Sequence, residues 1–343
     1  MARKQNKGGG KRQRAKQRAQ YDELDKYPVM PPHAFARIVR DKQTLNIIYQ
    51  IIEPPMTKRE QEYRDEILDI FIRSLTANIE EIDANPEAYI RTAMDKVIKA
   101  YSMKINKKSK SKIFYYLRRD LIGYGQMDVL MNDINVEDIS MDGTGVPIFA
   151  YHRKFESVET TCVWNTDHEL ESYVIKLAQR CGKHISVADP LLDATLMDGS
   201  RIVMKLGHEI STRGSAFCIR RFKDDPFSPA DIVAFRTMSS LMVAYLWIGF
   251  QNEVPMLFVG GTASGKTTTL NAMCIFIPWQ MKIVSIESTR EVNIPQPNWV
   301  PGLTRQGFGG ESTDGVIGEF ELLKAALRER PEYIIVGEIR GAE

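Results

Sequence analysis

The chain has 343 residues, of which 43% are hydrophobic and 26% charged, and its formal net charge is +2. This composition indicates a folded globular protein with more than one core, and it excludes the fibrous and fully disordered classes. The longest apolar run, Leu241 to Phe250, is about half the length of a membrane-spanning helix, so no span is expected. The four cysteines form no C-x-x-C pair, which argues against a zinc site or a disulfide framework.

A basic disordered tail is predicted for residues 1–26. The first twenty residues carry eight Lys or Arg and no acid, so the rest of the chain has a net negative charge. A Gly-interrupted basic segment of this kind does not fold alone, and it is available to anionic lipid headgroups, nucleic acid or an acidic partner. The alternative is a solvated tail that only aids solubility.

A helical segment is predicted for residues 27–115. Thr57 to Glu60 have the pattern of a capping box, and apolar residues then recur at three- and four-residue steps. These apolar positions are Leu68, Phe71, Leu75, Ile79 and Ile82. We expect their face to serve as core or as a subunit contact, not as a ligand site. A basic patch, Lys104 to Lys112, lies near the end of the segment.

An α+β domain is predicted for residues 116–223. Two strands are expected around the turn at Arg153, followed by a helix that begins with the capping box at Thr166 and ends at Gly182. Two more strands are expected at Ser200 to Leu206 and at Ser215 to Phe222, before a linker.

The second of these strands carries two consecutive arginines. Because side chains alternate along a strand, Arg220 and Arg221 are predicted to lie on opposite faces. An arginine presented to a bound triphosphate across a domain or subunit boundary would stabilise charge on the γ-phosphate. A solvated strand arginine is the alternative.

The most specific motif is GGTASGKT, Gly260 to Thr267, a complete phosphate-binding loop. A short buried strand, Pro255 to Val259, is expected before it and a helix after it. In such a loop the backbone N–H groups bind phosphate oxygens, Lys266 reaches the β- and γ-phosphates, and the Thr267 hydroxyl binds Mg²⁺. The predicted nucleotide-binding residues are Gly260, Gly261, Thr262, Ala263, Ser264, Gly265, Lys266, Thr267 and Thr268.

Two glutamates follow predicted strands downstream of this loop. Met281 to Ile286 ends at Glu287, and Tyr333 to Val336 ends at Gly337 and Glu338. Parallel sheets place catalytic groups at the carboxyl ends of their strands. We therefore expect one carboxylate to help hold magnesium and the other to polarise the attacking water.

With these residues, the chain resembles the ATPases that drive type II and type IV secretion and the assembly of type IV pili and archaella. Most of the chain is similar to the archaeal members of this family. Four motifs carry the resemblance: FVGGTASGKTTTLNA, IVSIESTREVNIP, PNWVPGLTR and LLKAALRERPEYIIVGEIRGAE. From about residue 116 onward nearly the whole chain is covered. The resemblance implies an α/β protein whose RecA-like P-loop NTPase core spans residues 224–343.

The resemblance also implies roles for single residues. Glu287 matches the acidic-box glutamate that activates water, and Glu338 matches the Walker B glutamate and magnesium ligand. Gly337 stands where many phosphate-loop proteins have Asp. Arg220 and Arg201 match arginines that the N-terminal domain brings toward the nucleotide. The predicted catalytic residues are therefore Glu287, Glu338, Arg220 and Arg201, and the predicted metal ligands are Thr267 and Glu338.

Two departures from the family pattern are visible. Ser288 replaces the acid that commonly follows Glu287, which removes one carboxylate near the metal and the water. The sequence also stops at Glu343, before the Gly-His and His-Ala box of the family. We therefore expect a nucleotide core that is incomplete at its C-terminal end, with an unfilled sheet position beside the strand at Tyr333 to Val336.

The implied function is an ATP- and Mg²⁺-dependent motor for filament assembly or secretion. The resemblance implies a hexameric ring, a polytopic membrane platform protein as partner, and a cytoplasmic location at the membrane. It does not choose between pilus, archaellum and secretion machinery. Two alternatives remain at this point: a nucleotide-binding scaffold without hydrolysis, and a nucleic-acid motor suggested by the basic tail. The acidic body of the chain argues against the second.

Overall fold

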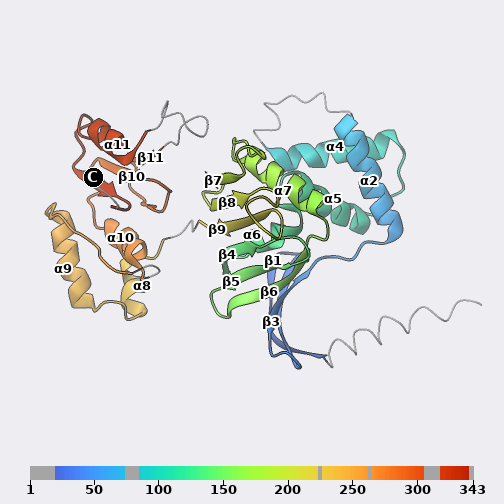
Figure 1. Ribbon diagram of the computed structural model, residues 1–343, viewed down its shortest axis with the longest axis horizontal. Helices are drawn as coiled ribbons and strands as arrows, with labels where there is room; N and C mark the ends of the chain where they lie inside the picture. The colour runs from blue at the N-terminus through green and yellow to red at the C-terminus, as the bar shows by residue number, and fades with distance from the viewer. Residues whose placement is uncertain (1–19, 74–84, 223–225, 262–263, 305–316, 340–343) are drawn as a thin grey trace, which may run out of the picture. The chain divides into compact units, whose positions relative to one another are not determined.

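The computed structural model describes residues 20–73, 85–222, 226–261, 264–304 and 317–339. The chain divides into two compact units (Figure 1). Unit 1 comprises Met1–Leu192 and Ile202–Arg221, and unit 2 comprises Asp193–Arg201 and Phe222–Glu343. The predicted domain boundary at residue 223 lies close to the change of unit after Arg221, and residue 223 itself is outside the described residues.

Within the described residues a nine-stranded sheet, most of which belongs to unit 1, has the strand order β1-β2-β3-β6-β5-β4-β9-β8-β7. Its strands are β1 (Tyr21–Met30), β2 (Ala34–Asp41), β3 (Ile47–Ile52), β4 (Val136–Met141), β5 (Pro147–His152), β6 (Glu156–Val163), β7 (Leu191–Thr195), β8 (Arg201–Lys205) and β9 (Ala216–Arg220). The β1–β2, β2–β3, β4–β5, β5–β6 and β4–β9 pairs are antiparallel, and β3 pairs with β6 in parallel.

The helical prediction for residues 27–115 is wrong for its first part, which forms β1, β2 and β3, and residues 21–26, predicted as tail, lie in β1. The reason is a period-two pattern: Ala34, Ala36 and Ile38 are fully buried on one face of β2. Because Ile48 of β3 faces Glu159 of β6, this segment shares one sheet with the predicted α+β domain and does not form a separate layer.

Helices do form after residue 57. They are α2 (Lys58–Arg73), α4 (Pro86–Ala100) and α5 (Lys107–Leu121), which lie together in Figure 1. The predicted capping box is confirmed, because Thr57 N–H donates to Glu60 Oε2 at 2.8 Å and Glu60 N–H donates to Thr57 Oγ1 at 3.3 Å. The three helices enclose their own apolar core, formed by Ile67, Ile90, Met94, Val97, Ile113 and Leu117.

The other predicted elements of unit 1 are confirmed. β5 and β6 flank the turn at Arg153, and the strands predicted before the linker are β8 and β9. The helix α7 (Asp167–Arg180) begins after Thr166, whose hydroxyl accepts from Glu169 N–H at 3.4 Å, and Gly182 follows it with a φ of +67°. The short helices η1 (Gly125–Met127) and α6 (Asp128–Asn132) lead into β4.

A buried polar cluster fastens β1 and β3 to the loop after α6. The hydroxyls of Tyr27 and Tyr49 each donate to Asp133 Oδ2 at 2.6 Å. His152 Nδ1 accepts from Lys154 N–H at 3.1 Å, so Nε2, which lies 3.0 Å from the Tyr27 hydroxyl, carries the ring proton. Burial lowers the pKa of His152, which favours this neutral ring at pH 7. The N-terminal strand is thus anchored by hydrogen bonds as well as by apolar packing.

Unit 2 contains a parallel sheet with the strand order β11-β10-β12. Its elements are α8 (Pro229–Ala234), α9 (Ser240–Gln251), α10 (Lys266–Cys274), β10 (Ile283–Glu287), β11 (Trp299–Leu303), α11 (Glu319–Ala326) and β12 (Tyr333–Val336). Met273, Cys274, Ile283 and Val292 are almost fully buried and join α10 to the sheet. This arrangement confirms the predicted α/β class, with a parallel sheet after the phosphate loop.

One predicted strand of unit 2 is wrong. Residues 255–259 have no strand assignment, and the side chains of Leu257 and Val259 are 75% and 83% exposed. A strand needs a neighbour for its backbone hydrogen bonds, and in the described part of the chain this segment pairs with neither β10 nor the free edge of β12. β11 was not predicted, because Pro301 and Gly302 inside it are more typical of a turn.

Candidate functional site

The phosphate-loop sequence enters α10 through a left-handed glycine. Gly265 is the N-cap residue with a φ of +87°, a conformation that glycine adopts without a steric penalty. Lys266 is the first residue of α10, and its Nζ donates to Gly261 O at 2.8 Å. Among the described residues, no side chain caps this end of the helix, so the first N–H groups of α10 are open to an anionic ligand.

Close packing shapes the rest of the loop. A Cβ atom on Gly260 would lie 2.6 Å from Ser264 Oγ, whereas one on Gly261 would meet no atom within 4 Å. A side chain at position 260 would therefore have to displace the Ser264 hydroxyl. Thr267 and Thr268 lie in the first turn of α10, where a hydroxyl can face a ligand at the helix N-terminus. The predicted residues Thr262 and Ala263 lie outside the described residues.

Glu287 is a buried carboxylate at the carboxyl end of β10, only 1% exposed. Its Oε1 accepts from Glu291 N–H at 2.8 Å and from Val292 N–H at 2.7 Å. Its Oε2 is buried too, and no hydrogen-bond partner is recorded for it among the residues described. Burial raises the pKa of this carboxyl above its usual range, against the lowering effect of the two backbone donors. One oxygen thus fixes the side chain, while the other is a buried acceptor without a donor in the described part of the chain.

Gly337 provides the space that Glu287 occupies. Gly337 follows β12, and its N–H donates to Ile286 O at 2.9 Å, which brings the two strand ends together. A Cβ atom at position 337 would lie 2.9 Å from Glu287 Cγ and 3.5 Å from Oε1. The next residue, Glu338, is exposed at the same edge of the sheet. The Gly-Glu pair thus leaves room for the Glu287 side chain and adds a second acidic residue at the end of the neighbouring strand.

We expect the new methyl group in Gly337→Ala to displace the Glu287 carboxylate. The rate of a reaction that depends on this carboxylate should then fall at least tenfold. Overpacking at this contact should also reduce the free energy of unfolding by about 1–3 kcal/mol. Urea denaturation of the single variants and of Gly337→Ala combined with Glu287→Ala measures the coupling. The loss of unfolding free energy caused by Gly337→Ala should be smaller in a protein that also carries Glu287→Ala. An equal loss with and without Glu287→Ala would contradict the steric explanation.

Asn271 is a residue of the site that sequence reasoning missed. From α10 its Nδ2 donates to Glu291 O at 2.8 Å, and its Oδ1 accepts from Asn293 N–H at 3.1 Å. This amide therefore ties the phosphate-loop helix to the same segment whose N–H groups hold Glu287. The only signal in the sequence is that an amide follows the motif within the next turn of the helix.

The two predicted arginines both form ion pairs. Arg201 makes two hydrogen bonds to Asp193, at 2.5 and 3.2 Å, and both residues belong to unit 2. Arg220 lies on the exposed face of β9 in unit 1, opposite the buried Phe217 and Ile219, with its Nε 3.2 Å from Asp138 Oδ1. The predicted alternation of faces is confirmed. The proposed role of these arginines toward nucleotide remains a prediction.

The donor groups of this site suit magnesium held mainly by a phosphate ligand. Among the described residues, no group of three or more His, Cys, Asp or Glu side chains could hold a metal ion by itself. The Thr267 hydroxyl at the start of α10 and the exposed Glu338 carboxylate are hard oxygen donors of the kind that Mg²⁺ prefers. With the unpartnered Glu287 Oε2, these groups fit a nucleotide-bound Mg²⁺ and its water.

Comparisons with known proteins add independent information. A family model described as "Type II/IV secretion system protein" matches residues 155–343. The uncharacterized protein MJ0900 of Methanocaldococcus jannaschii is 36% identical over 304 residues, which are 88% of this chain and 53% of that protein. The type IV secretion system protein VirB11 of Bartonella henselae is 27% identical over 54% of this chain and 60% of its own length. The chain thus spans about half the length of its M. jannaschii relative.

Solved structures give a weaker likeness. The Legionella pneumophila ATPase DotB is 16% identical, with a TM-score of 0.39 over 62% of this chain and 57% of its own. At such values the family assignment depends on the sequence matches. Within the described residues, no helix has both the length and the apolar character needed to cross a bilayer.

Proposed function

Since this chain belongs to the type II/IV secretion system protein family, we propose that it is an ATP-hydrolysing motor. The observation that carries the proposal is the combination, within unit 2, of a phosphate loop at the start of α10 and a buried carboxylate, Glu287, with one unpartnered oxygen. The loop supplies binding for the triphosphate, and the carboxylate supplies a base for water.

In this proposal, different residues bind the phosphates, hold Mg²⁺ and activate water. The N–H groups at the start of α10 and Lys266 hold the phosphates, and Thr267 with Glu338 would hold Mg²⁺, which neutralises charge on the β- and γ-phosphates when bound. Glu287 accepts a proton from the attacking water or orients it. Arg220 and Arg201 are proposed to exchange their carboxylate partners for the γ-phosphate, so that these ion pairs would depend on ATP hydrolysis.

The proposed role in the cell is the assembly of a type IV-like filament or of secretion machinery. The family match supports it, together with the similarity to a protein named as part of a type IV secretion system. We propose that the motor works as a homo-oligomeric ring, at the cytoplasmic face of the membrane and against a membrane platform protein. The basic residues before position 20 offer a further contact to anionic lipid.

The decisive experiment measures phosphate release and ATP binding by the purified protein, with Mg²⁺ and with EDTA. We expect Mg²⁺-dependent turnover that saturating single-stranded or duplex nucleic acid leaves unchanged. ATP binding without any turnover would identify a nucleotide-binding scaffold instead. Strong, salt-sensitive stimulation by nucleic acid would favour a nucleic-acid motor.

A further inference from the structure

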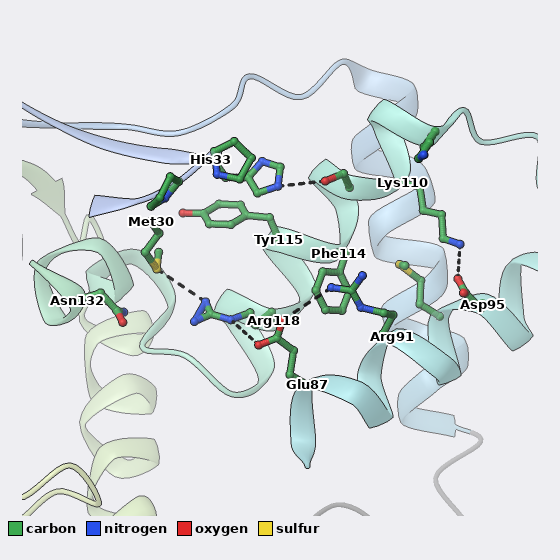
Figure 2. A pocket seen from close by; sticks show the side chains of 15 residues that line it. Met30, His33, Glu87, Arg91, Asp95, Lys110, Phe114, Tyr115, Arg118 and Asn132 are labelled. Carbon is green, nitrogen blue, oxygen red and sulfur yellow. Dashed lines mark hydrogen bonds and ion pairs between the residues drawn. The ribbon is translucent and has the colours of Figure 1, made fainter. Parts of the chain in front are cut away.

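A pocket of about 640 Å³ lies in unit 1, far along the chain from the phosphate loop. Figure 2 shows its walls: the turn between β1 and β2, the helix α4, most of the length of α5, and Asn132 at the end of α6. Its volume is within the range of roughly 300–1,000 Å³ that is usual for ligand sites. Its lining residues fall between positions 30 and 132, before the residues 155–343 that the family model matches. Nucleotide chemistry shared by the family therefore does not explain it.

The lining combines an apolar surface with charges of both signs. The apolar side includes Met30, Pro31, Pro32, Met94, Phe114 and Tyr115. The charged side has four cations, Arg91, Lys107, Lys110 and Arg118, and two carboxylates, Glu87 and Asp95. The lining thus has an excess of two positive charges. A ligand that fits both sides has an apolar part and a net negative charge.

Two arginines of the lining, Arg91 and Arg118, share one weakly held partner, Glu87. The Arg91 guanidinium carbon lies 4.3 Å from the centre of the Phe114 ring. The Nη2 atom of Arg91 lies 3.8 Å from Glu87 Oε1. Arg118 contacts Glu87 at 3.6 Å and Asp128 at 3.4 Å. The two pairs with Glu87, at partly exposed positions, contribute little free energy, whereas the Asp128 partner of Arg118 is buried. A ligand carboxylate can therefore take the place of Glu87 between the two guanidinium groups at small cost.

The lysines extend the positive charge toward the start of α5. Lys110 is paired with Asp95 at 2.6 Å, whereas no ion pair is recorded for Lys107 within the described part of the chain. The backbone of α5 is not available for phosphate in the same way as that of α10, because Asn106 Oδ1 accepts from Ser109 N–H at 2.8 Å. Glu87 and Asp95 in the wall need hydrogen-bond donors, which a peptide backbone has and phosphate groups lack.

We propose that this pocket binds a short acidic peptide segment of a partner protein, with an apolar or aromatic side chain beside its carboxylates. The carboxylates contact Arg91, Arg118 and Lys107, and the apolar side chain covers Met30 and Tyr115. The peptide's N–H groups can donate to Glu87 and Asp95, so the mixed charge of the wall favours a peptide over a nucleotide or a lipid headgroup. This site would attach the motor to its partner independently of ATP.

The test uses the labelled peptide acetyl-Glu-Asp-Phe-Leu-Asp-Glu-amide and fluorescence anisotropy with the full-length protein. We expect saturable binding that weakens as salt rises. Arg91→Glu should raise the dissociation constant about tenfold and Lys107→Glu about threefold, because each removes an attraction and adds a repulsion. The matched controls are Lys96→Glu on α4 and Lys108→Glu on α5, which are exposed but do not line the pocket and should leave binding unchanged.

Further arms separate the other ligand classes. Unlabelled MgATP and vesicles of phosphatidylcholine with phosphatidylserine should not displace the peptide, and a peptide with Lys in place of the acids should not bind. The proposal would be overturned if the acidic peptide did not bind, or if Lys107→Glu and Lys108→Glu weakened its binding equally. It would also be overturned if ATP or vesicles bound in a way that depends on Arg91 while the peptide did not. Since the readout needs no ATP hydrolysis, it stands apart from the test of the motor function.

Discussion

Lys266→Ala is expected to abolish ATP turnover and to weaken ATP binding about 100-fold. The ammonium group lies at the first position of α10, with Gly261 O at 2.8 Å, so it is held beside the N–H groups that would receive the phosphates. Charge-assisted hydrogen bonds to phosphate are among the strongest in proteins, and losing two of them costs about 3 kcal/mol, a factor of about 100. Titration calorimetry with ATP and a phosphate-release assay measure both effects.

The matched control for this variant is Lys324→Ala. Lys324 is exposed on α11, where its Nζ lies 4.3 Å from the centre of the Phe320 ring, and it has no place in the proposed site. Both variants should unfold at the same denaturant concentration as the parent. Unchanged ATP affinity in Lys266→Ala would remove the basis of the motor proposal.

Glu287→Gln is expected to reduce turnover about 100- to 1,000-fold while ATP binding changes less than about twofold. Glutamine keeps the shape of the side chain and an oxygen for the N–H groups of Glu291 and Val292, but it cannot take a proton from water. Single-turnover hydrolysis and equilibrium ATP binding separate the two effects. Loss of binding in parallel with turnover would indicate a structural role instead.

The pH dependence of Glu287 provides a second signature. Burial raises the pKa of the Glu287 carboxyl. In the parent protein, the fall in rate toward low pH should therefore occur above the pKa of a free glutamate, about 4.3. The residual activity of Glu287→Gln should not show this fall. A carboxyl with a raised pKa in the folded state favours folding at low pH, and this contribution is lost as pH rises through the folded pKa. The glutamine variant should therefore be at least as stable as the parent at pH 8, with the difference decreasing toward pH 4. A variant that is less stable at pH 8 would contradict the burial argument.

The parts of the site with a local signal could be predicted from the sequence. The phosphate loop, α10, β10 and β12 are specified by glycine spacing and by short apolar runs, and the placement of Glu287 and Glu338 at strand ends follows from them. The steric role of Gly337 could not be predicted, since it depends on a 2.9 Å approach between residues 50 positions apart in the chain. The contacts of Asn271 likewise depend on how α10 packs against the segment after β10.

The errors in the predicted fold arise where long-range pairing decides the structure. β3 is held by β6 more than 100 residues later, with Ile51 N–H donating to Thr161 Oγ1. The helical prediction is therefore wrong for residues 27–52, where no local pattern reveals this pairing. The opposite error concerns residues 255–259, whose apolar run predicts a buried strand although no described neighbour pairs with it. The pocket near Arg91 has no sequence signal, because its walls come from four separate elements.

The hydrogen bonds of Asn271 make the phosphate-loop helix and the Glu287 side chain mechanically dependent on each other. A ligand that pulls α10 even slightly also pulls the backbone at Glu291, and that backbone carries one of the two N–H groups that orient the carboxylate. A movement of α10 thus reaches the Glu287 side chain through one amide, without any change in the sheet itself. The orientation of this carboxylate therefore depends on the helix as well as on the strand that carries it.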